Sequence, residues 1–169
     1  MLRLLTVSCL IAVSFCFQAY LLPRVTSHVG SVLSMTNTRF PNLEKCLYRE
    51  YGSFFAPMER QFYANDVTFI DPLTSFTGID KYQANVDMLA GRNSIGGFLF
   101  RDASIALHNI TPIGENQLQT RWTLQVDVKF LPWQPRAKFT GVSIYTIAGE
   151  SGSEKVIKQE DYWDSVNLQ

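Results

Sequence analysis

The clearest pattern in the chain is a row of apolar residues at helical spacing that begins just after Phe40. Side chains three or four positions apart share one face of an α-helix, so this segment is predicted to pack one face on a core. Pro57 interrupts the row and predicts a long helix followed by a short one that ends near Asn65-Asp66. The row consists of Leu43, Leu47, Tyr51, Phe54, Met58 and Phe62.

The second half of the chain alternates between apolar and polar residues. From Leu118 to Phe130 the apolar residues fall mainly on every second position, as in a strand with one buried face. Turn sequences rich in glycine or proline separate this segment from its neighbours. The other predicted elements are a short strand over 67–70, a third helix over 79–90, and long strands over 98–110, 137–147 and 156–163.

The order of these elements, helices first and long strands last, predicts the α+β class. Three N-terminal helices would pack on one face of a curved antiparallel sheet. Helices cover the concave side of such a sheet only in part, and the uncovered part is a natural ligand pocket. Residues 42–169 are long enough to form this single domain with its own core.

The first 41 residues follow neither pattern. A run of 20 uncharged residues, 4–23, is typical of a signal peptide, and we assign residues 1–16 to it with cleavage before Phe17. Residues 17–41 hold two arginines, six serines or threonines and no acid, as transit peptides do. Together they resemble the bipartite presequence of algae with complex plastids. Secretion, or a membrane anchor over residues 4–23, stays open as an alternative.

The charge distribution supports this division of the chain. There are 15 basic and 15 acidic residues, and every acidic one lies at or after Glu44. Residues 44–169 therefore hold 12 basic and 15 acidic residues, a net charge of −3. Without a basic excess we expect no nucleic-acid partner. Membrane contact is expected only through an uncleaved N-terminus.

Metal and cofactor chemistry has little support in the sequence. His108 and Cys46 are the only histidine and the only cysteine after residue 41, too few for a zinc site or an internal disulfide. The chain has no phosphate-binding loop, dinucleotide fingerprint or nucleophile elbow. We therefore expect neither a metal nor a cofactor.

Three stretches resemble the nuclear transport factor 2-like (SnoaL-like) superfamily. Residues 62–72 are similar to its segment of tyrosine, acidic turn, strand and Asp-Pro, and residues 76–82 to its segment of glycine followed by a helix. Residues 159–168 are similar to the last strand of the ketosteroid isomerase-type members. The resemblance implies a cone fold over about residues 42–168. Within the superfamily the chain looks most like an uncharacterised group from plants, algae and cyanobacteria.

The resemblance also implies candidate catalytic residues. Asp71 falls where isomerase-type members keep their general base, and a carboxylate on an apolar wall can move a proton next to a carbonyl. Tyr48 could approximate the tyrosine that holds the oxyanion, while the second donor position falls near Ser143, a weaker donor than the carboxylic acid of the isomerase. Alternatively, Asp71 only begins the turn it forms with Pro72.

His108 offers a second chemistry through the same resemblance. Dehydratase members use a histidine with an aspartate, and His108 with Asp71 would be such a pair. The alternative is a partly exposed histidine with no catalytic role.

Aromatic residues supply the candidate pocket lining: Tyr63, Tyr82, Trp122 and Trp163 could line a cavity together with Ser143, or simply fill the core. Trp133, between two prolines, is the best candidate for a protein contact. Arg121 and Asp161 could pair across neighbouring strands.

Two function classes follow from these residues and from the resemblance. The first is a non-catalytic module that binds a small apolar ligand or a partner protein, with a homodimer through the sheet as one form of the latter. The second is a small lyase or isomerase that uses Asp71 as its base. We favour the binding module, because the strong second oxyanion donor is missing.

Overall fold

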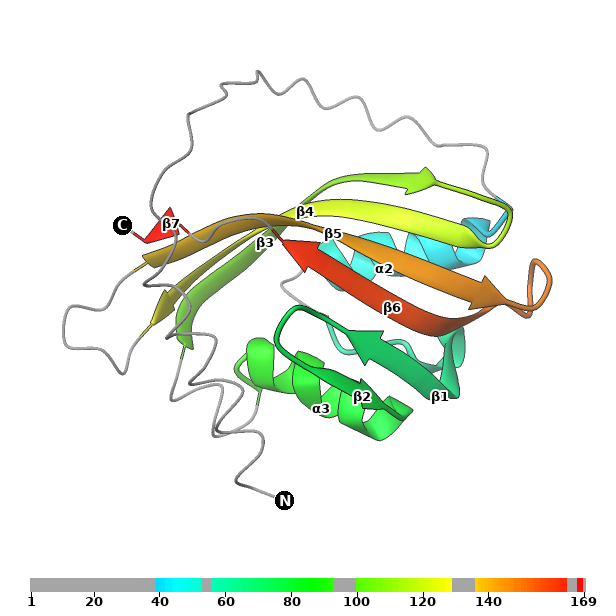
Figure 1. Ribbon diagram of the computed structural model, residues 1–169, viewed down its shortest axis with the longest axis horizontal. Helices are drawn as coiled ribbons and strands as arrows, with labels where there is room; N and C mark the ends of the chain where they lie inside the picture. The colour runs from blue at the N-terminus through cyan, green and yellow to red at the C-terminus, as the bar shows by residue number, and fades with distance from the viewer. Residues whose placement is uncertain (1–38, 53–55, 93–99, 129–135, 164–166, 169) are drawn as a thin grey trace.

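The computed structural model describes residues 39–52, 56–92, 100–128, 136–163 and 167–168. These residues form one curved sheet with the strand order β2-β1-β6-β5-β4-β3, and β7 pairs with β5 (Figure 1). The strands are β1 (Tyr63–Ile70), β2 (Ser75–Thr77), β3 (Phe100–Pro112), β4 (Gln117–Val128), β5 (Arg136–Ala148), β6 (Lys155–Trp163) and β7 (Asn167–Leu168).

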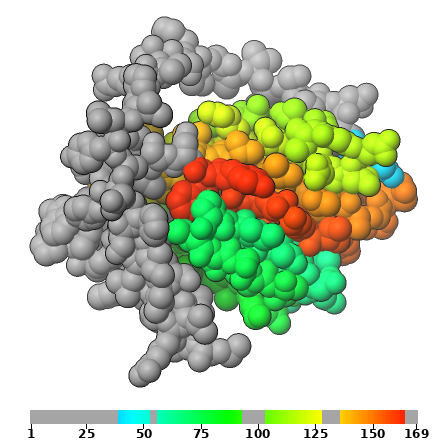
Figure 2. Space-filling view, viewed as in Figure 1, coloured from blue at the N-terminus to red at the C-terminus, as the bar shows by residue number. Residues whose placement is uncertain are grey.

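The four long strands confirm the alternation in the sequence, with ends that differ from the predicted ones by at most two residues. They pair antiparallel from β3 through β6. The prediction of a wholly antiparallel sheet is wrong, because β1 pairs with β6 in parallel. Figure 2 shows β6 at the surface, with β5 on one side and β1 and β2 on the other.

The prediction of three helices is also corrected. Among the described residues there are two α-helices, α2 (Pro41–Gly52) and α3 (Ile79–Leu89), and one 3-10 turn, η1 (Arg60–Phe62). The predicted short second helix is replaced by η1 and by β1, which begins at Tyr63. The two consecutive exposed residues Asn65 and Asp66 break the alternation of β1, so the sequence pattern showed only its second half.

The core lies between the sheet and the two helices. Leu43 and Leu47 on one face of α2 are completely buried, as are Val67 of β1 and Val156 of β6. Helix α2 lies behind the long strands and α3 packs on β1 and β2 (Figure 1). The inner face of the sheet is thereby enclosed between helices, and its polar side chains must find partners there.

No helix in the described part of the chain is long and apolar enough to cross a membrane. The predicted signal-like and transit-like segments lie outside the described residues, apart from residues 39–41.

Candidate functional site

A row of polar side chains crosses the inner face of the sheet. Thr120 of β4 is the cross-strand neighbour of Ser143 of β5, which in turn neighbours Asp161 of β6. Thr120 and Ser143 are completely buried and Asp161 is partly buried. Because side chains alternate along each strand, all three point into the space between sheet and helices.

Asp161 is the central ionisable group of this row. Its Oδ1 accepts a hydrogen bond from Nε2 of Gln159 at 2.8 Å, and Ser143 donates a second hydrogen bond to it. Among the described residues no Lys or Arg forms an ion pair with this carboxyl group. Burial raises the pKa of Asp161 from 3.8 to about 7, the hydrogen bonds oppose that shift, and the charge of Asp71 adds to it. Near neutral pH, some molecules therefore carry Asp161 as the protonated acid and the others carry it as the carboxylate.

A tyrosine of α2 ties the row to the helix. The Tyr51 hydroxyl lies 3.0 Å from the hydroxyl of Tyr145, 3.1 Å from that of Thr120 and 3.2 Å from that of Ser143. Nε1 of Trp122 also donates to Ser143, at 2.9 Å. Burial raises the pKa of Tyr51 to about 12, so its hydroxyl stays protonated.

Helix α3 reaches Asp161 through Gln159. The Tyr82 hydroxyl donates to Oε1 of Gln159, whose amide nitrogen then donates to Asp161. The chain of hydrogen bonds from Tyr82 to Tyr51 thus passes through Asp161 and joins both helices to the sheet. Such a network fixes the orientation of the carboxyl group.

A small cavity opens on this network. It has a volume of about 50 Å³. Tyr51, Tyr82, Tyr145, Gln159 and Asp161 form its polar wall, and Met58, Phe69, Val86 and Leu89 form its apolar part. Since one water needs roughly 10–15 Å³ of such space, the cavity has room for a ligand of only a few heavy atoms unless a side chain moves.

Glu50 brings a second carboxyl group to this cavity. Its Oε2 accepts from the Tyr63 hydroxyl at 2.5 Å and its Oε1 from the backbone N–H of Glu59 at 2.8 Å. Burial raises the pKa of Glu50, while these hydrogen bonds oppose the shift. Both oxygens are occupied, which makes Glu50 a structural partner of Tyr63.

Asp71 lies next to this row, just beyond the end of β1. Its Oδ1 accepts hydrogen bonds from the backbone N–H groups of Leu73 at 2.7 Å and Thr74 at 2.6 Å, and its own N–H donates to the Thr74 carbonyl at 2.9 Å. Burial raises the pKa of Asp71 and the two backbone hydrogen bonds lower it. Asp71 therefore forms the turn that the sequence offered as its alternative role, and its role as a general base stays a prediction.

Asp71, Tyr48 and His108 do not meet at the cavity, because none of the three is among the residues that line it. Tyr48 is partly buried and packs against the core, but Tyr51, almost one turn later in α2, is the tyrosine that reaches the row. His108 is exposed on β3, where its Nε2 lies 2.7 Å from the Thr123 hydroxyl, and β4, β5 and β6 separate β3 from β1. The structure thus does not bring His108 and Asp71 together.

The predicted pocket residues lie around the cavity with different roles. Tyr82 lines it, while Ser143 and Trp122 are not part of its lining and belong to the hydrogen-bonded network with Tyr51. Tyr63 is buried with its ring 5.1 Å from that of Tyr82. The ring of Trp163 lies 5.5 Å from that of Phe139, and Trp163 follows Asp161 by two residues on β6. Trp133, the predicted protein contact, lies outside the described residues.

Sequence reasoning missed the central role of Asp161. The predicted pair of Arg121 and Asp161 is wrong, because β5 lies between their strands and Arg121 is exposed. One clue was available: Gln159, Asp161 and Trp163 alternate with Glu160 and Tyr162, so Asp161 shares one face of its strand with Trp163.

The chain matches a protein family over residues 42–155, the greater part of its length, and the family is described as "Uncharacterized conserved protein (DUF2358)". The chain belongs to this family. The matched stretch of this DUF2358 protein includes Tyr51, Asp71 and Ser143, whereas Asp161 lies six residues beyond its end. A comparison with proteins of curated function found no match.

Solved structures similar to this DUF2358 protein identify its fold. An NTF2-like protein from Burkholderia thailandensis has a TM-score of 0.56 at 10% identity, covering 72% of this chain and 87% of the other. A protein of Novosphingobium aromaticivorans, described as "Putative Scytalone Dehydratase", has a TM-score of 0.52 at 16% identity, covering 75% and 85%. The fold is therefore nuclear transport factor 2-like, as the sequence resemblance implied.

Within the described part of the chain, no three histidine, cysteine, aspartate or glutamate side chains come together as metal ligands would. The DUF2358 site is instead a network of hydrogen bonds around a buried carboxyl group. The pKa of that carboxyl group, Asp161, lies near neutral pH.

Proposed function

We propose that this domain binds a small, partly apolar molecule in the cavity at Asp161, and that the protonated carboxyl group donates a hydrogen bond to an oxygen of that molecule. The observation that carries the proposal is a carboxyl group with a pKa of about 7 on the wall of an aromatic cavity. A buried carboxyl group without a cationic partner destabilises a fold when it ionises, and ligand binding is a common reason for such a group to persist.

The shape of the cavity supports a ligand with one polar end. The polar wall at Asp161 and the tyrosines would take an oxygen, and the apolar part at Met58 and Leu89 would take carbon. The flexible side chain of Met58 is the simplest part of the wall to move for a larger ligand.

The test is probe binding as a function of pH. We expect small ketones and amides such as acetone and acetamide to bind the full chain about tenfold more tightly near pH 6 than near pH 8. The protonated form of Asp161, which donates the hydrogen bond, makes up most of the population near pH 6 and about a tenth of it near pH 8. Protein-observed NMR, read at the amides of Asp161 and Tyr145, would measure the affinities.

Two variants sharpen this test. Asp161→Asn keeps a donor at every pH and should abolish the pH dependence, whereas Asp66→Asn, on an exposed carboxylate of β1, should leave it unchanged. Equal affinities at both pH values in the unaltered chain would contradict the proposal.

Proton transfer is the second candidate function. The observation that favours it is again Asp161, because a general acid or base works best with a pKa near the working pH, and Asp71 lies close enough to act on it electrostatically. Deuterium exchange next to the carbonyl of the bound ketone would reveal this activity, and bound probe without exchange would leave only the binding function.

We further propose that the protein acts in a plastid. The support is the sequence of residues 1–41, with its uncharged run and its acid-free, hydroxyl-rich continuation. Fused to a fluorescent protein in an alga with complex plastids, residues 1–41 should direct the reporter to the plastid, and residues 17–41 alone should leave it in the cytosol. Reporter retained in the secretory pathway by residues 1–41 would refute this location.

A further inference from the structure

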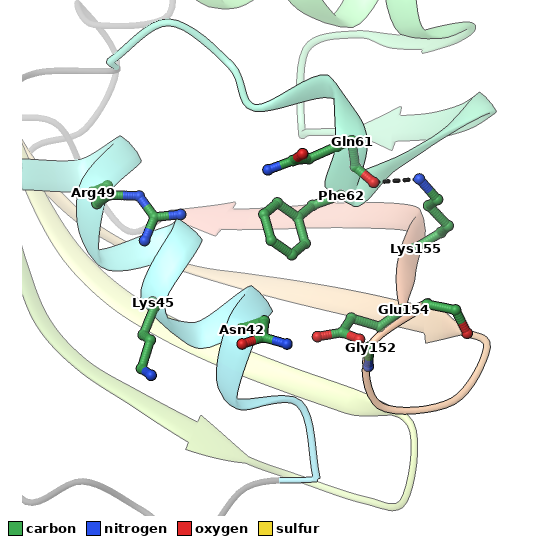
Figure 3. Close-up of a pocket in the computed structure, with 9 residues that line it drawn as sticks. Asn42, Lys45, Arg49, Gln61, Phe62, Gly152, Glu154 and Lys155 are labelled. Carbon is green, nitrogen blue, oxygen red and sulfur yellow. Dashed lines mark hydrogen bonds between the residues drawn. The ribbon is translucent and has the colours of Figure 1, made fainter.

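A second and larger pocket lies between α2, η1 and the turn that joins β5 to β6 (Figure 3). Its volume of about 320 Å³ falls in the range of small-molecule sites, roughly 300–1,000 Å³. It shares no lining residue with the cavity at Asp161. The proposed function above therefore says nothing about it.

Glu154 gives this pocket an unsatisfied acceptor. The residue is only 3% exposed, and its Oε2 accepts from the backbone N–H of Gly152, which holds the turn in place. Its Oε1 is buried and makes no hydrogen bond with any described residue. Figure 3 shows the carboxylate directed into the pocket, toward the side chain of Asn42. A buried carboxylate oxygen without a donor is costly, so a donor from outside the chain would be strongly favoured there.

The turn itself is built to hold Glu154 in this position. Gly149 and Gly152 have φ values of 93° and 94°, which favour glycine over other residues. A side chain at Gly149 would also lie 2.7 Å from the carbonyl oxygen of Ser153. The unsatisfied oxygen is therefore not the result of a loose loop.

Three cationic side chains surround the same pocket. Arg49 is held by Glu59 through two hydrogen bonds of 2.6 and 2.9 Å, and Lys155 donates to the backbone carbonyl of Gln61 (Figure 3). Lys45 lies on the same helical face as Arg49, is exposed, and forms no ion pair within the residues that the structure describes. Lys45 is thus the cation available to an anionic group at the rim.

We propose that this pocket binds a small molecule that carries both an ammonium group and an anionic group, the chemistry shared by amino acids and amino phosphates. The ammonium group donates to Oε1 of Glu154, and the carboxylate or phosphate pairs with Lys45. Phe62, whose ring faces the pocket, covers the carbon chain between them (Figure 3). Charge-assisted hydrogen bonds of this kind supply orientation as well as affinity.

The contributions of the ammonium group and of the anionic group to binding can be tested separately. We expect phosphoethanolamine or β-alanine to bind the full chain with a dissociation constant of about 1 mM or lower, measured by NMR at the amides of Gly152 and Lys155. Ethanolamine and inorganic phosphate each carry one of the two groups and should bind at least about tenfold more weakly. Tighter binding of phosphoethanolamine than of β-alanine would identify the pocket as an amino phosphate site, and the reverse order would identify it as an amino acid site.

Matched variants complete the test. Glu154→Gln keeps an oxygen for Gly152 but presents an amide donor to the pocket, so it should weaken phosphoethanolamine binding about tenfold or more. Lys45→Met, on an exposed residue, should weaken it several-fold, whereas Lys81→Met, at an exposed position of α3 outside the pocket, should have no effect. No saturable shift with either full probe, inorganic phosphate as tight as phosphoethanolamine, or unchanged affinity in both pocket variants would overturn the proposal.

Discussion

Asp161→Asn is expected to raise the free energy of unfolding near pH 8 by about 3 kcal/mol, and to change it little near pH 4. The cause is the pKa of this carboxyl group, which burial raises from 3.8 to about 7. A shift of about three units corresponds to about 4 kcal/mol between the protonation states, and the loss of hydrogen bonds to the charged carboxylate offsets a part of the gain.

The sign of the pH dependence follows from the raised pKa. The folded chain binds the Asp161 proton more tightly than the unfolded chain, so the associated stability is full below pH 3.8 and is lost as the pH rises to about 7. Urea unfolding of both chains across this interval measures the difference directly. Asp66→Asn, an exposed carboxylate of β1, is the matched control and should show no such trend. The same stability gain at pH 4 as at pH 8 would show that the carboxyl group is not the cause.

Gly141→Ala is expected to destabilise the protein by about 3 kcal/mol, because a methyl group has no space at this position. Gly141 of β5 pairs with Trp122 of β4, whose ring lies across it. An added Cβ would lie 2.5 Å from Cη2 of Trp122 and 2.9 Å from the backbone oxygen of Tyr162. The ring must move, and its hydrogen bond to Ser143 is then lost. Thermal or urea unfolding with near-ultraviolet circular dichroism would follow both effects.

A double-mutant cycle isolates the ring as the obstacle. Trp122→Phe removes the atoms that the new methyl group would meet, so the double variant should be more stable than the two single losses predict, by about 1–2 kcal/mol. Gly114→Ala is the control, because a Cβ there meets nothing within 4 Å, and its effect should stay within about 0.5 kcal/mol. Strict additivity in the cycle would assign the loss to the contact with Tyr162 instead.

Local patterns in the sequence predicted most of the fold. Alternation over 118–130 placed β4 within two residues of its ends, because a half-buried strand must alternate. Helical spacing after Phe40 predicted the buried face of α2 but not its end at Gly52. The direction of β1 relative to β6 could not be predicted, because strand pairing depends on contacts between residues about 90 positions apart.

The candidate site was harder to predict for the same reason. Asp71 was a candidate because of a local motif. In the structure its carboxyl group accepts hydrogen bonds from the backbone N–H groups of Leu73 and Thr74 in the turn that follows it. The stretch around Asp161, residues 159–168, resembled a last strand but indicated no role for the carboxyl group, whose raised pKa comes from burial by helices and strands distant in sequence. One feature of the sequence does indicate the pocket at Glu154. Its lining residues Asn42, Lys45 and Arg49 form a polar stripe at helical spacing beside the apolar face of α2.

The position of β6 has a consequence for how the chain comes to be folded. This strand lies between β1 and β5 but is made after both, so during synthesis the two flanking parts of the sheet leave the ribosome before the strand that joins them. The sheet can close only when residues 155–163 have emerged, which favours late, concerted folding over domain growth from the N-terminus. A chain that stops before residue 155 therefore loses the middle of its sheet and Asp161 together.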